Sequence, residues 1–228
     1  MTRITHQVDR IGAAVHTTTG RSSRRHWLRI VGVGYALSWI AGMLVWAPST
    51  TVRSSGSQVL ATTTGHEAVA ALQYVLTEGL PAVGLLVVGL ALASATRPAS
   101  RLIAAGSVLA AAVSAGQCLL GLGLTLWAVP AEHVGAAGGL FEAVTRLDGV
   151  KMAAIAVAAA TAAVLALGGR IPLPRWLIGV SLALAVSIAA TAVGYLLLLT
   201  AGAVVAYVSL PLLIVWITGT AWTLRRAQ

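Results

Sequence analysis

One acidic residue, Glu78, lies inside a long apolar stretch of the sequence. An ionisable side chain within a membrane span costs about 2.5–3.5 kcal/mol on insertion scales, and such residues usually face a bundle interior or a water-filled cavity. Counting from an inner boundary at Ala95 places Glu78 about 5 Å below the outer boundary. Two interpretations stay open. Glu78 is either a shallow carboxylate bonded to a neighbouring helix or water, or part of a ligand, ion or proton site.

Pro81 follows Glu78 by three residues in the same apolar stretch. A proline has no backbone N–H, so it releases the carbonyl of Thr77 from its helical hydrogen bond. We expect a kink at this point, which would open space beside Glu78.

Other polar side chains are predicted at a similar depth. Gln117 lies 16 residues beyond Arg101, which corresponds to about 24 Å of helix and reaches the outer part of the bilayer core. The candidate ligand-binding residues are Glu78, Gln117, Gln73, Tyr74, Tyr195 and Tyr207. Their common depth predicts a polar crevice that opens outward and is closed below. The alternative is that outer helix ends simply tolerate polar groups, with interhelical hydrogen bonds of about 0.6 kcal/mol each.

The segment between the third and fourth apolar runs contains most of the remaining charge. If it is helical, Glu142 pairs with Arg146 and Asp148 pairs with Lys151, which we interpret as a charged collar that caps the fourth span. Zinc prefers ligands such as those offered by His66, Glu132 and His133, but the sequence has no HExxH motif or regular ligand spacing. We therefore expect no metal and no cofactor.

The composition decides the class of protein. Of the 228 residues, 58% are hydrophobic and 9% are charged, whereas soluble domains carry about 25% charged residues. An all-α, polytopic membrane protein with six transmembrane helices is predicted, with a basic N-terminal arm at 1–29 and the membrane domain at 30–228. The alanine-rich fourth span should be central, because alanine permits close helix approach. The predicted spans are 30–47, 68–95, 102–127, 150–168, 176–199 and 202–224.

The basic residues orient these spans. With the N-terminus inside, only Arg53, Arg146 and Lys151 of the 15 Lys and Arg residues lie outside, which leaves twelve inside. This positive-inside bias predicts that both termini are cytoplasmic. The net charge of +9 does not indicate a nucleic-acid partner, because no basic patch is interleaved with aromatic residues.

The fifth and sixth spans carry a family resemblance. The segment 171–177 reads Ile-Pro-Leu-Pro-Arg-Trp-Leu, and the sixth span contains Leu210-Pro211, Trp216 and Gly219. In these features the chain resembles uncharacterised six-helix bacterial integral membrane proteins of unknown function. The resemblance implies a fold and no activity. Together with the Ala-, Gly- and Arg-rich composition, it favours a multi-pass protein of the bacterial inner (plasma) membrane.

Three classes of function remain open. The first is a module or accessory subunit that binds a small molecule or lipid in the outward-facing crevice. The second is a small proton- or cation-coupled transporter that uses Glu78. The third is an intramembrane enzyme, which is disfavoured because the sequence offers no nucleophile–base pair. The expected partners are membrane lipids, a small-molecule ligand and further subunits in a homo- or hetero-oligomer.

Overall fold

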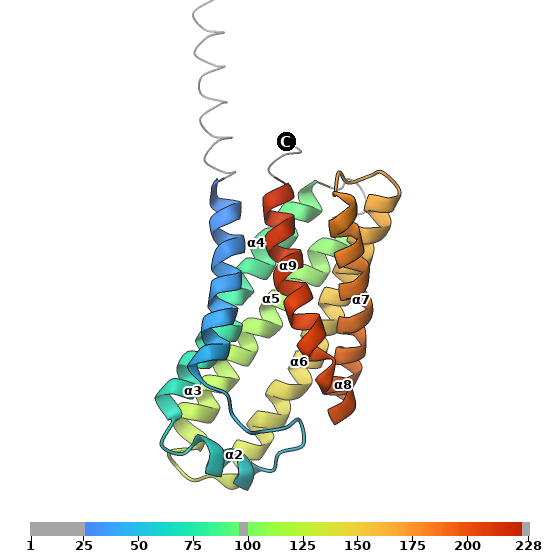
Figure 1. Ribbon diagram of the computed structural model, residues 1–228. Coiled ribbons are helices and arrows are strands. Elements are labelled where there is room, and N and C mark those ends of the chain that lie inside the picture. Colours follow the sequence, from blue (N-terminus) through green and yellow to red (C-terminus); the bar gives the residue numbers. More distant parts are fainter. Residues whose placement is uncertain (1–25, 96–99, 225–228) are drawn as a thin grey trace, which may run out of the picture.

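The computed structural model describes residues 26–95 and 100–224, and within these ranges every regular element is a helix (Figure 1). Most of the predicted arm, 1–25, lies outside the described residues. The N-terminal helix covers His26–Val45. After it come α2 (Gly56–Thr63), α3 (Glu67–Tyr74), a π-helical turn η1 (Val75–Gly79), α4 (Leu80–Ser94), α5 (Ser100–Gly123), a second π-helical turn η2 (Leu124–Ala128), α6 (Val134–Leu167), α7 (Arg175–Leu196), α8 (Thr200–Val204) and α9 (Ala206–Thr223).

Six helical segments in the described ranges are long and apolar enough to cross a membrane, which agrees with the predicted number of spans. Three of them combine shorter elements: α3, η1 and α4 form the second span, α5 and η2 the third, and α8 and α9 the sixth. The six segments are His26–Val45, Glu67–Ser94, Arg101–Ala128, Val134–Leu167, Arg175–Leu196 and Thr200–Thr223.

Two boundaries differ from the sequence-based expectation. The chain is already helical at His26, so the last part of the predicted arm belongs to the first helix. The larger difference concerns α6, which begins at Val134 and not near residue 150. The expected long connection at 128–149 is therefore mostly helix, and Asp148 and Lys151 lie within α6.

The helices form a ring in sequence order. α4 packs against α5, α5 against α6, α6 against α7, and α7 against α9. The N-terminal helix closes this ring, because Gly32 lies against Ala221 of α9 and Tyr35 lies against Gly84 of α4. Small residues at these contacts allow the backbones to approach closely, as is usual between helices in membranes.

The alanine-rich helix α6 is the most buried of the six spans, although it is one member of the ring and packs mainly against α5 and α7. Its residues Met152, Ile155 and Ala159 belong to one hydrophobic core to which the N-terminal helix, α4, α5, α7 and α9 also contribute. Most members of this core lie in the half of the bundle nearer the chain termini.

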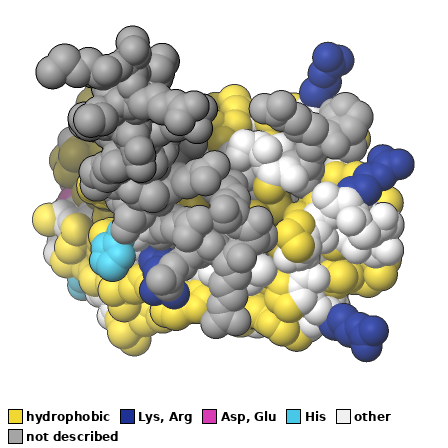
Figure 2. Space-filling view, turned by 90° about the horizontal axis from the view of Figure 1, so that it is seen from above, with side chains coloured by type: hydrophobic (Ala, Val, Ile, Leu, Met, Phe, Trp, Pro, Cys, Tyr) yellow, Lys and Arg dark blue, Asp and Glu magenta, His cyan; other side chains and the backbone are white. Residues whose placement is uncertain are grey.

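The two ends of the bundle differ in composition. His26 and Thr223 lie at one end, here called the terminal end, whereas α2 lies at the opposite end, here called the α2 end (Figure 1). Seen from above the terminal end, basic side chains project at the rim (Figure 2). Arg101 and Arg175 stand at the starts of α5 and α7 on this side. The basic side chains at the terminal end thus match the charge asymmetry seen in the sequence.

The close contact between α5 and α6 gives a test of the packing. A Cβ atom on Gly106 would lie 2.8 Å from the backbone oxygen of Ala154, whereas one on Gly116 of the same helix would meet nothing within 4 Å. We expect Gly106→Ala to lower the free energy of unfolding by about 1–3 kcal/mol, the usual cost of overpacking. Gly116→Ala, the matched control, should be neutral or stabilising. Thermal unfolding in detergent measures both, and equal effects would contradict the close contact between α5 and α6 at Gly106.

Candidate functional site

The second span widens at the position of Glu78. Residues 75–79 form a single π-helical turn in which the N–H of Leu80 donates to the carbonyl of Val75. Pro81 follows directly and cannot donate a hydrogen bond, so the regular α-helical pattern is interrupted here. The structure therefore realises the expected distortion as a π-helical turn, a feature that is frequent at functional sites.

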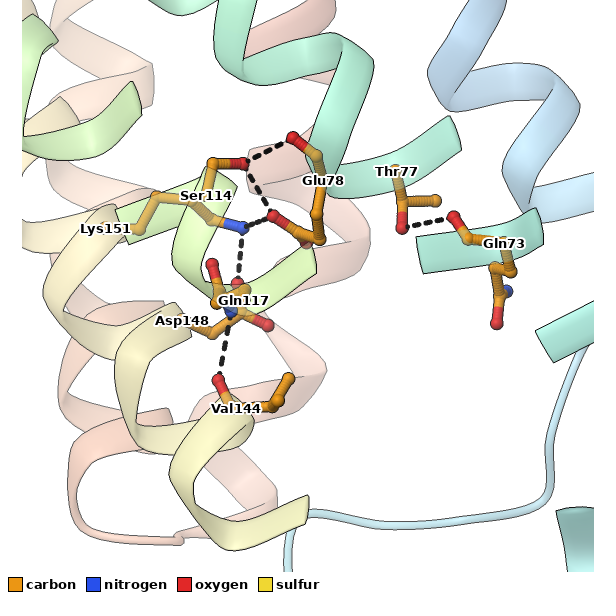
Figure 3. A network of polar contacts seen from close by, with 8 residues as sticks. All are labelled: Gln73, Thr77, Glu78, Ser114, Gln117, Val144, Asp148 and Lys151. Atoms are coloured by element: carbon orange, nitrogen blue, oxygen red, sulfur yellow. Dashed lines mark hydrogen bonds and ion pairs between the residues drawn. The ribbon is translucent and has the colours of Figure 1, made fainter. Parts of the chain in front are cut away.

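This turn directs Glu78 toward α5 and α6, where it meets two polar side chains (Figure 3). Its Oε2 atom lies 2.6 Å from Nζ of Lys151 and 2.7 Å from Oγ of Ser114. Lys151 Nζ also lies 2.7 Å from Oδ1 of Asp148, one turn earlier on α6. We call Glu78, Ser114, Asp148 and Lys151 the Glu78 cluster. It joins three spans at a single point.

The Glu78 cluster is buried and has an unequal number of charges. The side chains of Lys151 and Glu78 are 3% and 8% exposed, and that of Asp148 is 21% exposed. When all three are ionised, two carboxylates face one ammonium group, which leaves a net charge of −1. An uncompensated charge is costly in a low-dielectric interior. A proton or a cation at this point would therefore be stabilised.

The charged-collar hypothesis was only partly right. The pairs Glu142–Arg146 and Asp148–Lys151 form at 2.8 Å and 2.7 Å, as predicted for a helical segment. However, Lys151 is not part of a solvated collar, because its ammonium group points inward to Glu78. A signal for this was present in the sequence: Lys151 is the single lysine of a chain whose other strongly basic residues are all arginine.

Gln117 lies near this cluster but does not bond to Glu78. Its Nε2 atom donates to the carbonyl of Val144 on α6 at 3.0 Å, and its buried Oε1 atom has no hydrogen-bond partner within the described part of the chain. Ser114, about one turn earlier on α5, takes the position beside Glu78.

A cavity of about 320 Å³ adjoins the Glu78 cluster in the α2 half of the bundle. Four of the six candidate residues, Gln73, Tyr74, Glu78 and Tyr195, line it, and so does Asp148. Of the other two, Gln117 lies outside its lining, and Tyr207 is 78% exposed and lines a neighbouring cavity. The structure thus has a cavity lined by four of the six candidates, and the outward-opening crevice stays a prediction.

The connection between the N-terminal helix and α2 borders this cavity. Gln73 donates from Nε2 to the carbonyl of Trp46 at 2.6 Å and so satisfies a free carbonyl just beyond the end of the N-terminal helix. Arg53 donates from Nε to the carbonyl of Leu198 at 2.7 Å, which ties the same connection to the turn after α7. These two bonds hold residues 46–53 beside the cavity.

The residues considered for a metal stay apart from this site. His133 packs its ring against Trp127, with 5.8 Å between the ring centroids, and His66 precedes α3 without a capping bond from its side chain. Glu132 lies in the short connection before α6, with a positive φ of 55°. Within residues 26–95 and 100–224, no three His, Cys, Asp or Glu side chains come together in a group that could hold a metal ion.

Ser114 and Glu78 have the spacing of a nucleophile and a base, a pair that the sequence did not reveal. Yet Ser114 is only 1% exposed and is not among the residues that line the cavity. A substrate in the cavity would not reach its hydroxyl group. The geometry therefore supports a role in binding Glu78 and not in covalent chemistry.

Comparison of the chain with family models, curated protein sequences and solved structures gives no match. The resemblance to six-helix bacterial membrane proteins stays a prediction. The arguments about function below depend on the geometry of the site.

The charge inequality of the Glu78 cluster predicts unequal effects of mutation. Glu78→Gln leaves one carboxylate for Lys151, so we expect a loss of at most about 1 kcal/mol. Lys151→Met leaves two buried carboxylates without a cation and should cost about 3–5 kcal/mol. Unfolding free energies in detergent measure this difference.

Arg146→Met provides the control on the same helix. Its ion pair with Glu142 is 52% exposed on both sides, and exposed pairs contribute about 1 kcal/mol or less. If Glu78→Gln destabilised the protein as much as Lys151→Met, the assignment of a net negative charge to the cluster would be wrong.

Proposed function

We propose that this protein is an integral membrane module that binds a small, mostly apolar molecule in the cavity beside Glu78. The observation that carries the proposal is the cavity of about 320 Å³, in which two carboxylates meet a lining of aromatic and aliphatic side chains. Ligand sites are typically concave and mainly apolar, with a few convergent polar groups that orient the ligand. Such a module would act as a sensor or as an accessory subunit of a larger membrane assembly.

The cavity would open to the outside of the cell. The support for this is the charge bias of the sequence, together with the position of the cavity in the α2 half. In this orientation both termini are cytoplasmic, and the protein lies in a bacterial plasma membrane. The apolar core in the terminal half separates the cavity from the cytoplasm.

Cysteine labelling tests this orientation. In a Cys118→Ser background, Ser57→Cys of α2 should react with a membrane-impermeant maleimide in intact cells. Arg170→Cys, at the terminal end, should react only after the membrane is opened. Both positions are exposed. The reverse pattern of labelling would overturn the orientation.

A second candidate function is proton- or cation-coupled transport. It is favoured by the excess negative charge of the Glu78 cluster, which a transported cation or a coupling proton would neutralise. Transport also requires a path through the core of the terminal half. Flux of a bound ligand into proteoliposomes would favour transport, whereas saturable binding without flux would favour the binding module.

Filling the cavity tests whether it binds ligands at all. Two probes share one shape: benzyltrimethylammonium, a permanent cation, and neopentylbenzene, its uncharged carbon analogue. We expect at least one probe to bind protein in neutral-lipid nanodiscs, measured by equilibrium dialysis against empty nanodiscs. Val144→Trp places an indole in the cavity lining and should abolish this binding.

Val157→Trp is the matched control for that experiment, because Val157 lies on the same helix but is 48% exposed on the outside of the bundle. This variant should bind the probe as the wild type does. If neither probe binds the wild type, or if Val144→Trp binds normally, the cavity is not the ligand site.

A further inference from the structure

The charge distribution around the cavity identifies the class of ligand. Resting on the binding function proposed above, we infer that the cavity binds a hydrophobic organic cation, an amine or quaternary ammonium group attached to an apolar body. The inference depends on the placement of three charged groups, on the aromatic lining and on the shape of the space.

The carboxylates and the ammonium group of the Glu78 cluster occupy different positions relative to the cavity. Glu78 and Asp148 are lining residues, whereas Lys151 is 3% exposed and lies outside the lining. Among the described residues that line the cavity, none is Lys or Arg. The wall therefore presents negative charge, and the lysine compensates only part of it from behind.

The lining also contains five aromatic residues, although aromatic residues make up only 5% of the chain. They come from the N-terminal helix, the connection after it, α3, α6 and α7. The faces of such rings attract cations by about 0.5–2 kcal/mol each, most strongly where water is excluded. Carboxylates next to aromatic rings suit an ammonium group better than a neutral or anionic one. The five residues are Trp39, Trp46, Tyr74, Phe141 and Tyr195.

The small number of metal ligands around the cavity favours an organic cation over a metal ion. Calcium and magnesium bind six or more oxygen atoms at about 2.0–2.6 Å, and residues 26–95 and 100–224 offer no group of three acidic or histidine ligands. A second cavity of about 350 Å³ adjoins the first and shares Met43, Tyr195 and Leu210 with it. In the proposed complex, the apolar group of the ligand packs against these shared residues.

The two isosteric probes test the inference directly. In nanodiscs of neutral lipid, we expect wild-type protein to bind benzyltrimethylammonium at least about tenfold more tightly than neopentylbenzene, because only the cation gains from the wall charge. This comparison needs no variant, so it does not depend on the folding of a mutant. Toluenesulfonate, an anion of similar size, should not bind.

A substitution at Asp148 locates the charge responsible. Asp148→Asn should weaken binding of benzyltrimethylammonium roughly tenfold to a hundredfold and leave that of neopentylbenzene unchanged. Glu142→Gln is the control, because it removes the same charge from the same helix at an exposed position outside the cavity lining. It should bind both probes as the wild type does.

The outcomes separate the two proposals. Tighter binding of the cation, lost in Asp148→Asn and kept in Glu142→Gln, would support the inference. Equal or tighter binding of neopentylbenzene would overturn the inference and leave the proposed binding function intact. Absence of binding by both probes would overturn the two together.

Discussion

The arrangement of the bundle depends on the buried ammonium group of Lys151, which needs carboxylate partners within the spans. A carboxylate in a membrane span needs a positive partner, and the nearest one lies 73 residues further along the chain. To bring the two together at 2.6 Å, the second span widens into a π-helical turn and α6 continues unbroken past its charged first half. Ser114 adds a contact from α5. One interaction thus fixes the relative rotation of three helices that hydrophobic contacts alone would specify weakly, because their apolar faces run nearly all round.

The same interaction divides the molecule into two halves with different properties. In the terminal half, alanine and glycine allow the helices to pack closely, and a continuous apolar core fills the centre. In the α2 half, a connection held by Gln73 and Arg53 borders the cavity beside the Glu78 cluster. In the proposed orientation, this division would give a ligand access from outside and a seal toward the cytoplasm. A transporter would have to rearrange the tightly packed half, whereas a binding module would not.

Hydropathy predicted the six spans, because each must be apolar over most of its length, but it could not place the start of α6. The first part of that helix contains glycine, acidic and basic residues and has no need to be apolar where it extends beyond the bilayer core. Counting depth along the spans placed Glu78 and Gln117 at a similar level. It did not predict which side chain contacts Glu78: Gln117 bonds to Val144, and Ser114 occupies the position beside Glu78. Residues three apart on a helix lie on the same face at heights about 4.5 Å apart, and only packing decides which of them contacts a given partner.

The second carboxylate of the Glu78 cluster is not required to stabilise the bundle. A single carboxylate would already neutralise Lys151, and a buried lysine with two carboxylates costs more than one with a single partner. Asp148 lies toward the cavity and is the most exposed of the three. A bundle optimised for stability alone would replace it or Glu78 with an uncharged residue. The excess charge fits the site proposed above, which a proton or a positively charged ligand would complete. In that proposal, the stability of the bundle and the affinity of the cavity share one electrostatic origin.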